Sequence, residues 1–470
     1  MALTAFPLGS WPLLQTAARA ALAGRAALTQ QRAFARATGL DPQRRHSSTS
    51  SGGAAGGDFK PPAADASDAL ADAIEVPGGR VPVTTQLSFA GGVFSKGAPK
   101  VPCYRALDAA GRPLEGAQVP HPLGEEKALR LYTAMARMQV MDTLFYEAQR
   151  QGRFTFYMTC AGEEATILGS AAALDPQDQV FAQYREQGVL LWRGFSFDDF
   201  ANQCYGNERE PGKGRQMPIH YGSKALAYHT ISSPLATQLP HAVGAAYALK
   251  LQGAPLLAAA YFGEGASSEG DFHAALNFAA TLGAPCLFIC RNNGYAISTP
   301  SYEQYRGDGL APRGPSYGMP SIRVDGGDAL AVYNATAAAR RVALEHGCPV
   351  LIEAMSYRSG HHSTSDDSSR YRTREEMAEW RARDPVVRFR QWLDHQGWWD
   401  AEREAALRKD QRHQVMAALE AAAKVPKSPL SSAFDDVYAS LPWHLREQRD
   451  AALEFARRHP HVVPPGVPVR

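Results

Sequence analysis

The residues best suited to chemistry lie in the stretch YFGEGASSEGD at positions 261–271, between an apolar run and a helical pattern. Its glycines let the backbone approach a ligand closely, and the start of a helix offers free N–H groups that bind phosphate. Glu264 lies between two of these glycines, where its carboxylate would repel a bound phosphate unless a cation separates them. The stretch therefore predicts a phosphate site that also holds Mg²⁺, which prefers oxygen ligands.

A second group of metal ligands is expected where the next apolar run ends, at Arg291-Asn292-Asn293-Gly294-Tyr295. The carboxyl ends of parallel strands meet at one edge of a sheet, so the two segments should lie together. An Asn side-chain oxygen and a backbone carbonyl are suitable ligands, and Arg291 would neutralise phosphate charge. A dinucleotide-binding turn needs the spacing G-x-G-x-x-G, whereas this turn has G-x-G-x-x-x-x-G. A purely structural strand–turn–helix connection is the other alternative.

The elements that must position these segments alternate between short apolar runs and helical patterns. Strands are expected at 178–184, 256–262, 286–291, 320–325 and 349–356, and helices around 131–145 and at 162–174, 196–205, 237–252, 269–282 and 328–346. Gly253, Gly283 and Gly347 follow three helices as stop signals, and Ser196 with Asp199 forms a capping box. This alternation predicts an α/β fold with a parallel sheet covered by helices on both faces.

The two ends of the chain differ from this α/β part. Residues 1–40 contain no Asp or Glu but several Arg, so residues 1–50 are expected to be an organelle transit peptide, mitochondrial rather than plastid. A disordered tail is the alternative. Residues 51–120 are expected to be a linker and an extended arm. The α/β domain should span 121–373, and a helical C-terminal region 374–470.

Within that C-terminal region, Thr373 with Glu376 predicts a capping box, and Pro385 predicts the start of a helix. Further helices are expected at 400–424 and 433–459.

Composition argues against several other classes of protein. The 470 residues are 45% hydrophobic and carry a net charge of +2, so neither a nucleic-acid site nor a membrane surface is expected. No apolar run approaches the ~18 residues of a membrane span. The six cysteines include no C-x-x-C pair, which favours a reducing compartment and buried thiols.

The glycine and asparagine segments resemble the thiamine-diphosphate motif, in which a G-D-G turn is followed further along by N-N. Here the turn is Gly263-Glu264-Gly265, with Glu in place of Asp. That replacement resembles the alpha subunits of branched-chain 2-oxo acid dehydrogenases, whereas pyruvate-specific relatives keep Asp. The resemblance covers roughly residues 80–450 and includes FAQYREQGVLLWR, CYGNEREPGKGRQMP, HTISSPLATQLPHAVGAAYA, RNNGYAISTPSYEQYRGDG and SYRSGHHSTSDDSSRYR.

The resemblance implies a site for thiamine diphosphate, magnesium and potassium. The implied cofactor contacts are Tyr184, Arg185, Ser233, Leu235, Gly265, Ala266, Arg291 and His362. The implied magnesium ligands are Glu264, Asn293 and Tyr295, and the implied potassium ligands are Ser232, Pro234, Thr237 and Gln238. His362 is the candidate catalytic residue, a proton donor or acceptor with a pKa expected near neutrality. Zinc at His361 and His362 is disfavoured because neither a Cys nor an i,i+4 His accompanies them, and a solvated loop is the alternative.

The implied reaction is oxidative decarboxylation of branched-chain 2-oxo acids in the mitochondrial matrix, with acyl transfer to lipoyl groups of a transacylase core. A beta subunit would complete the site in a two-alpha two-beta heterotetramer. Ser363 and Thr373 match positions regulated by a kinase and a phosphatase, in a loop that Arg358, Asp366, Tyr371 and Arg372 would order. The alternatives are a pyruvate dehydrogenase alpha subunit and a non-catalytic regulatory subunit of the same fold.

Overall fold

The computed structural model describes residues 73–76, 79–82 and 100–470. The expected transit peptide, residues 1–50, and most of the expected linker and arm lie outside the described residues. In the N-terminal unit, β1 (Ala73–Val76) and β2 (Gly79–Pro82) form an antiparallel pair. The sequence did not predict this hairpin, because its four-residue strands are too short to show a period.

A parallel sheet forms the centre of the second unit, Thr85–Arg470. Its strands, in spatial order, are β3 (Cys103–Tyr104), β10 (Ser321–Asp325), β11 (Val350–Met355), β7 (Cys286–Asn292), β6 (Ala258–Gly263), β4 (Gln179–Phe181) and β5 (Tyr228–His229). Every pairing in this sheet is parallel. All five predicted strands are confirmed. The two edge strands were not predicted, and β3 comes from the segment expected to be an arm.

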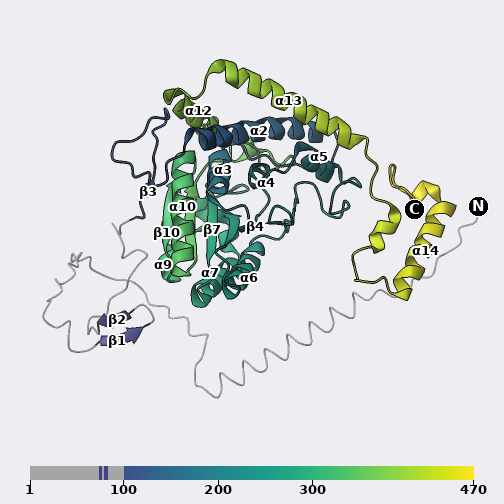
Figure 1. The fold of residues 1–470 in the computed structure, drawn as a ribbon, viewed down its shortest axis with the longest axis horizontal. Helices are drawn as coiled ribbons and strands as arrows, with labels where there is room; N and C mark the ends of the chain where they lie inside the picture. The colour runs from purple at the N-terminus through teal and green to yellow at the C-terminus, as the bar shows by residue number, and fades with distance from the viewer. Residues whose placement is uncertain (1–72, 77–78, 83–99) are drawn as a thin grey trace, which may run out of the picture. The chain divides into compact units, whose positions relative to one another are not determined.

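Helices cover both faces of this sheet (Figure 1). The helices flanking it are α2 (Glu125–Arg150), α3 (Glu164–Ala173), α4 (Gln187–Trp192), α5 (Phe197–Tyr205), α6 (Gln238–Leu251), α7 (Gly270–Leu282) and α10 (Ala329–His346). Successive strand residues face opposite sides. In β6, Tyr261 packs in a core with α2, α3 and α10, whereas Phe262 packs in a second core with α6 and α7. The predicted α/β class is therefore confirmed.

The predicted helix ends are confirmed where a cap was named. Ser196 and Asp199 form the full capping box at the start of α5. Gly283 and Gly347 end α7 and α10 with φ of 56° and 59°, and Gly253, just beyond α6, has φ of 66°. A left-handed backbone at these positions favours glycine.

The region after residue 373 is helical, with two corrections to the prediction. Its helices are α11 (Arg374–Arg381), α12 (Pro385–His395), α13 (Ala401–Ala423) and α14 (Trp443–Arg458), and α13 lies along α2 in Figure 1. The helix expected from 433 begins only at Trp443, because Pro442 disfavours a helical conformation in the residue before it. No helix of the described chain is both long and apolar enough to cross a membrane.

The second correction concerns the cap of α11. The Thr373 side chain accepts a hydrogen bond from the Glu376 N–H, as predicted. The Glu376 side chain does not return to Thr373, and instead accepts hydrogen bonds from the hydroxyls of Tyr295 and Tyr357. The capping box is thus only half formed, because two tyrosines use the carboxylate that would have completed it.

Gly169 in α3 lies against α10, as the Ala- and Gly-rich sequence of this helix indicates. An added Cβ would lie 3.0 Å from the Ala329 carbonyl oxygen and 3.2 Å from Val332. We predict that Gly169→Ala lowers the free energy of unfolding by about 1–3 kcal/mol, because the two helices must move apart. Gly244→Ala in α6, where a Cβ would meet nothing within 4 Å, should instead raise it by about 0.5–1 kcal/mol. Chemical denaturation of the full chain measures both, and equal changes would contradict the close contact.

Candidate cofactor site

A cavity of about 350 Å³ opens at the carboxyl ends of four neighbouring strands, β4, β6, β7 and β11. Ligands bind at this edge in open parallel sheets. The cavity is lined by Gln183, Tyr184, Arg185, Leu235, Gly263, Glu264, Gly265, Ala266, Arg291, Asn293, Tyr295, Ala296, Ile297, Arg358 and His362. Segments separated by up to 180 residues in the chain therefore meet where the sequence placed the phosphate and metal site.

Glu264 begins a short 3₁₀ helix, η2 (Glu264–Ser268), that directly follows β6. Its side chain is only 1% exposed. One carboxyl oxygen accepts a hydrogen bond from the Asn293 N–H at 3.3 Å, while the other, Oε1, has no partner. Burial raises the pKa of this carboxyl to about 7. A buried acceptor without a partner is costly, so this oxygen fits an added cation.

Gly265, which was expected to let the backbone approach a ligand, lines the cavity. A second constraint also acts at this position, because a Cβ on Gly265 would lie 2.9 Å from the Cβ of Ala296. Gly265 is therefore required by the packing of Ala296, which belongs to the short strand β8 (Tyr295–Ala296) paired with β9 (Thr299–Pro300).

The two adjacent asparagines after β7 have different surroundings. Asn292 donates to Glu353 at 2.8 Å and to the Tyr305 hydroxyl, both on the side away from the cavity lining. Asn293 lines the cavity, and its side-chain oxygen accepts from the Tyr295 N–H at 3.2 Å. Of the two, only Asn293 lines the cavity together with Glu264.

Arg291 is buried between two carboxylates rather than left free for a phosphate. It donates to Glu163 at 2.9 Å and to Glu186. The second oxygen of Glu186 accepts from the backbone N–H groups of Gln183, Tyr184 and Arg185. Arg291 lines the cavity, where it was expected to neutralise phosphate charge, and it is also paired with two carboxylates.

The ring of His362 is held by two guanidinium groups. Arg185 and Arg358 each lie 3.1 Å from its Nδ1. A guanidinium can only donate, so Nδ1 is the acceptor and the ring hydrogen resides on Nε2. Burial, followed by the charges of Arg185 and Arg358, lowers the pKa of His362 to about 3. The pKa of His362 therefore lies below the neutral range expected from the sequence, because burial and the two guanidinium groups oppose protonation.

The loop carrying His362 is ordered by the residues that the sequence indicated. Asp366 accepts from the His362 N–H at 2.7 Å and from the Tyr371 hydroxyl at 2.6 Å. Tyr371 also accepts from Arg358 at 2.9 Å, and Arg372 donates to the Arg358 carbonyl. Ser363 sits beside His362 but outside the cavity lining, and Thr373 is exposed at the helix cap.

The segment expected to hold potassium brings several neutral oxygens together. The Thr237 hydroxyl lies 3.3 Å from the Ser232 hydroxyl and 3.1 Å from the Pro234 carbonyl oxygen. Gln238 is buried beside them and donates to the Tyr261 carbonyl. Leu235 lines the cavity, whereas Ser233 does not and instead bonds His220 at 2.6 Å.

Sequence reasoning missed three residues of this site. Gln183 accepts from the Gly263 N–H and so joins β4 to the glycine turn. Ile297 lines the cavity with a positive φ of 58°, an unusual and strained conformation for a β-branched residue. Glu163 lies just behind the cavity. No sequence pattern could have revealed Ile297, because its conformation depends on the surrounding loop.

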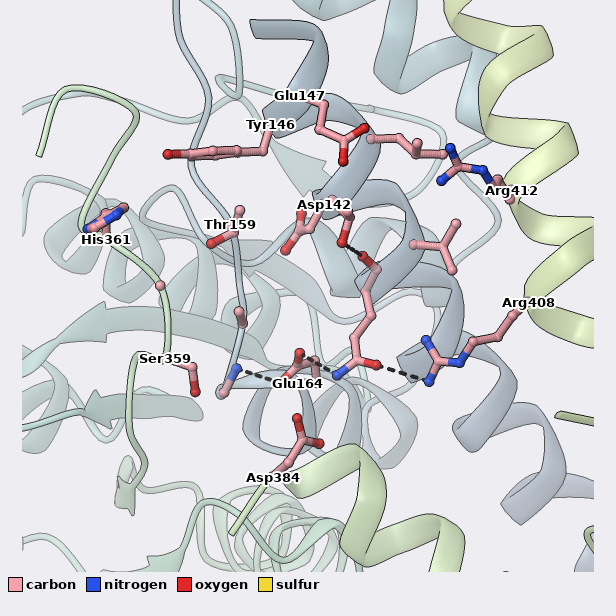
Figure 2. Close-up of a pocket in the computed structure, with 17 residues that line it drawn as sticks. Asp142, Tyr146, Glu147, Thr159, Glu164, Ser359, His361, Asp384, Arg408 and Arg412 are labelled. Atoms are coloured by element: carbon pink, nitrogen blue, oxygen red, sulfur yellow. Dashed lines mark hydrogen bonds between the residues drawn. The ribbon is translucent and has the colours of Figure 1, made fainter. Parts of the chain in front are cut away.

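A larger cavity of about 800 Å³ is lined by residues of α2, of α13 and of the 159–164 and 359–361 segments (Figure 2). Glu164 reaches it and accepts from Gln139, which in turn accepts from Arg408. Burial raises the pKa of Glu164 to about 8. None of the predicted site residues lines this cavity. We therefore assign the chemistry to the smaller one.

Comparison with known proteins identifies the class. The sequence pattern of the dehydrogenase E1 component family matches residues 132–431, which include every predicted site residue. The chain belongs to this family.

Its relatives include named subunits of one enzyme. The chain is 52% identical over 397 residues to the mitochondrial 2-oxoisovalerate dehydrogenase subunit alpha 1 of Arabidopsis thaliana, covering 84% of this chain and 83% of that protein. The mitochondrial 2-oxoisovalerate dehydrogenase subunit alpha of Homo sapiens is 56% identical over 352 residues, which cover 75% of this chain and 79% of that protein. The mitochondrial 2-oxoisovalerate dehydrogenase subunit alpha of Caenorhabditis elegans is 54% identical over 354 residues, which cover 75% of this chain and 82% of that protein.

The raised pKa of Glu264 predicts a pH-dependent effect of Glu264→Gln. The folded chain keeps this proton up to about pH 7, whereas the unfolded chain loses it near pH 4.5, so folding loses stability as the pH rises between these values. The glutamine variant lacks that loss. Without ligands, the free energy of unfolding of Glu264→Gln should match that of the wild type near pH 5. At pH 8 it should exceed the wild-type value by on the order of 3 kcal/mol. Urea denaturation at pH 5 and pH 8 measures both free energies of unfolding. A Glu264→Gln variant that is less stable than the wild type at pH 8 would contradict the prediction.

Proposed function

We propose that this chain is the alpha subunit of a mitochondrial branched-chain 2-oxo acid dehydrogenase, which acts in the matrix. The reaction is the oxidative decarboxylation of 3-methyl-2-oxobutanoate and the related 2-oxo acids from leucine and isoleucine. One observation carries the proposal: the unpartnered Glu264 oxygen lies in the same cavity as Asn293, Arg185 and His362. The identity to 2-oxoisovalerate dehydrogenase alpha subunits supports the choice of substrate and compartment.

The cavity fits thiamine diphosphate bound through magnesium. Glu264, the Asn293 side chain and the Tyr295 carbonyl would hold the metal, since hard oxygen ligands together with phosphates suit Mg²⁺. Tyr184, Arg185, Leu235, Gly265, Ala266 and Arg291 line the cavity and would contact the cofactor. Ser233 lies outside the lining and bonds His220, so it would have to turn to reach the cofactor. When bound, thiamine diphosphate supplies the nucleophilic carbon and the electron sink for decarboxylation.

His362 has a defined role in this arrangement. Its Nδ1 is occupied by two guanidinium groups, so only Nε2–H is free to donate. A neutral imidazole held in this way can donate a hydrogen bond to a phosphate or to a developing oxyanion without a change of charge. A bound diphosphate would offset the charges of Arg185 and Arg358 and raise the pKa of His362 toward the range useful for proton transfer.

Potassium would stabilise the turn before α6. The Thr237 hydroxyl lies within 3.3 Å of the Ser232 hydroxyl and of the Pro234 carbonyl oxygen, and Gln238 adds an amide. These ligands carry no net charge, which suits a monovalent cation. The ion would fix Leu235, the member of this segment that lines the cavity.

The active assembly would contain two alpha and two beta subunits. The described residues of this chain contain one parallel sheet with a cofactor edge, so a separate beta subunit would supply the other half of the site. The relatives are named as alpha subunits, in agreement with this. The acyl group would then pass to the lipoyl group of a transacylase core.

We predict that the chain co-expressed with its beta subunit decarboxylates 3-methyl-2-oxobutanoate at least about tenfold more efficiently than pyruvate. Activity should require thiamine diphosphate and Mg²⁺. Asn293→Ala should reduce kcat/KM by more than about 100-fold, since loss of an outer-shell partner alone costs about 10–100-fold. Steady-state assays of carbon dioxide release measure these values. Equal use of pyruvate would contradict the substrate assignment, and an active Asn293→Ala enzyme would contradict the metal site.

Ser363 would be a site of regulation by a kinase and a phosphatase. Its neighbours His362 and Asp366 are joined by a hydrogen bond that closes the loop. Phosphate on Ser363 would place about −1.5 to −2 charges beside Asp366 and the cofactor's phosphates. Thr373 matches a second such position, but its hydroxyl already accepts from the Glu376 N–H at the cap of α11.

We predict that Ser363→Asp lowers the activity of the assembled enzyme by about tenfold or more, because the added charge repels Asp366 and the diphosphate. Ser365→Asp is the matched control, since Ser365 is exposed on the same loop and its side chain forms no hydrogen bond in the described structure. It should retain nearly full activity. Equal losses in the two variants would indicate that any charge on this loop is harmful and would contradict a specific role for Ser363.

A further inference from the structure

Glu163 is a buried carboxylate directly behind the candidate site that sequence reasoning did not single out. It lies at the N-cap of α3 and is 0% exposed. One oxygen accepts from the Asn293 side-chain amide at 3.2 Å and from the Ser356 hydroxyl at 3.2 Å. The other accepts from Arg291 at 2.9 Å. Both oxygens are thus occupied, and one of them contacts a proposed metal ligand.

This contact determines which end of the Asn293 amide faces the cavity. An amide has an accepting oxygen and a donating NH₂ group, and a carboxylate can only accept. The NH₂ group must therefore point toward Glu163, which leaves the oxygen at the opposite end. The Tyr295 N–H donates to that oxygen at 3.2 Å and supports the same orientation. A cation would be attracted by the oxygen and repelled by the NH₂ group.

Charge balance does not by itself account for Glu163. Arg291 is already paired with Glu186, which is equally buried. A second carboxylate on the same guanidinium adds a buried negative charge with its own desolvation cost. Glu163 makes two contacts that Glu186 does not, with the Ser356 hydroxyl and with the Asn293 side-chain amide, and only the second of these reaches a residue that lines the cavity.

We propose that Glu163 is a positioning residue for the metal: it holds the Asn293 amide so that its oxygen faces the carboxyl of Glu264. The inference rests on the proposed function, because it requires a divalent cation at Glu264 and Asn293. Glu163 would not touch the ion. It would act as an outer-shell partner of the kind that orients metal ligands in other proteins.

Replacement by glutamine tests the orientation with little change of shape. In Glu163→Gln, the new amide oxygen can still accept from Arg291, which places the new NH₂ group toward Asn293. Two NH₂ groups then face each other, and the Asn293 amide should turn over and present NH₂ to the metal. Adding Asn293→Asp restores the match, because an aspartate accepts from the new NH₂ group and offers oxygen in either orientation.

Glu164→Gln is the matched control. Glu164 is the next residue, is 1% exposed, and carries the same carboxyl group. It faces the larger cavity of Figure 2, where it accepts from the Gly162 N–H and from Gln139, and it contacts neither Asn293 nor Arg291. The same substitution one position along therefore leaves the metal ligands untouched. Because burial raises the pKa of Glu164 to about 8, Glu164→Gln removes no negative charge near pH 7. The double variant, in which Asn293→Asp restores a carboxylate, controls for the charge that Glu163→Gln removes.

The experiment is a titration of the assembled enzyme with Mn²⁺ at saturating thiamine diphosphate, with free Mn²⁺ read by electron paramagnetic resonance. We expect Glu163→Gln to weaken Mn²⁺ binding by about 10–100-fold. Glu164→Gln should bind like the wild type, and Glu163→Gln with Asn293→Asp should recover most of the affinity. Binding by Glu163→Gln within about twofold of the wild type would overturn the proposal, as would a double variant as weak as Glu163→Gln alone.

The double variant and Asn293→Ala ensure that the titration tests the role of Glu163 in every case. If Glu163→Gln does not assemble, the double variant alone must still bind Mn²⁺ nearly as tightly as the wild type, and weak binding by it overturns the proposal. Asn293→Ala separates this inference from the proposed function. If Asn293→Ala binds Mn²⁺ as the wild type does, the metal site itself is misassigned. If it binds weakly while Glu163→Gln binds normally, the metal site stands and only the role of Glu163 fails.

Discussion

The buried carboxyl of Glu264, with one oxygen unpartnered, is the feature on which the site depends. An ionised carboxylate out of water needs a counter-charge, and its neighbours do not supply one. Arg291 is bound by Glu163 and Glu186, and Arg185 and Arg358 converge on His362. The surrounding polar groups are therefore already ordered. The unpartnered oxygen of Glu264 is therefore the basis on which we propose a cation in this cavity, with Arg185 and Arg358 nearby for the anion that would accompany it.

Around this cavity, consecutive residues of the same type make different contacts. Asn293 faces it, whereas Asn292 ties β7 to Glu353. His362 faces it, whereas His361 lines the larger cavity and bonds Ser368. Glu163 contacts the proposed metal ligand, whereas Glu164 faces the larger cavity. In each pair the backbone turns consecutive side chains to different sides, so one residue can serve the site while its neighbour supports the surrounding packing.

Much of this could be predicted from the sequence, and the rest depended on contacts between distant segments. Short apolar runs between helical patterns predicted the five main strands, but the two-residue edge strands β3 and β5 left no pattern to detect. Ten of the predicted ligand residues, from Tyr184 to His362, line one cavity. The residues that contact these predicted ligands could not be predicted from the sequence. The lowered pKa of His362 depends on Arg185, 177 residues earlier in the chain, and the role of Glu163 depends on Asn293, 130 residues later.

The most direct test of the account is the position of a divalent ion in the assembled enzyme. Crystals grown with the beta subunit, thiamine diphosphate and Mn²⁺ would be measured at the manganese absorption edge. We expect an anomalous peak within ligand distance of the Glu264 carboxyl, the Asn293 side-chain oxygen and the Tyr295 carbonyl. Diphosphate oxygens should complete its coordination. A well-ordered cofactor with no such peak, or with the ion bound away from Glu264, would contradict the claim that this buried carboxyl exists to hold a metal.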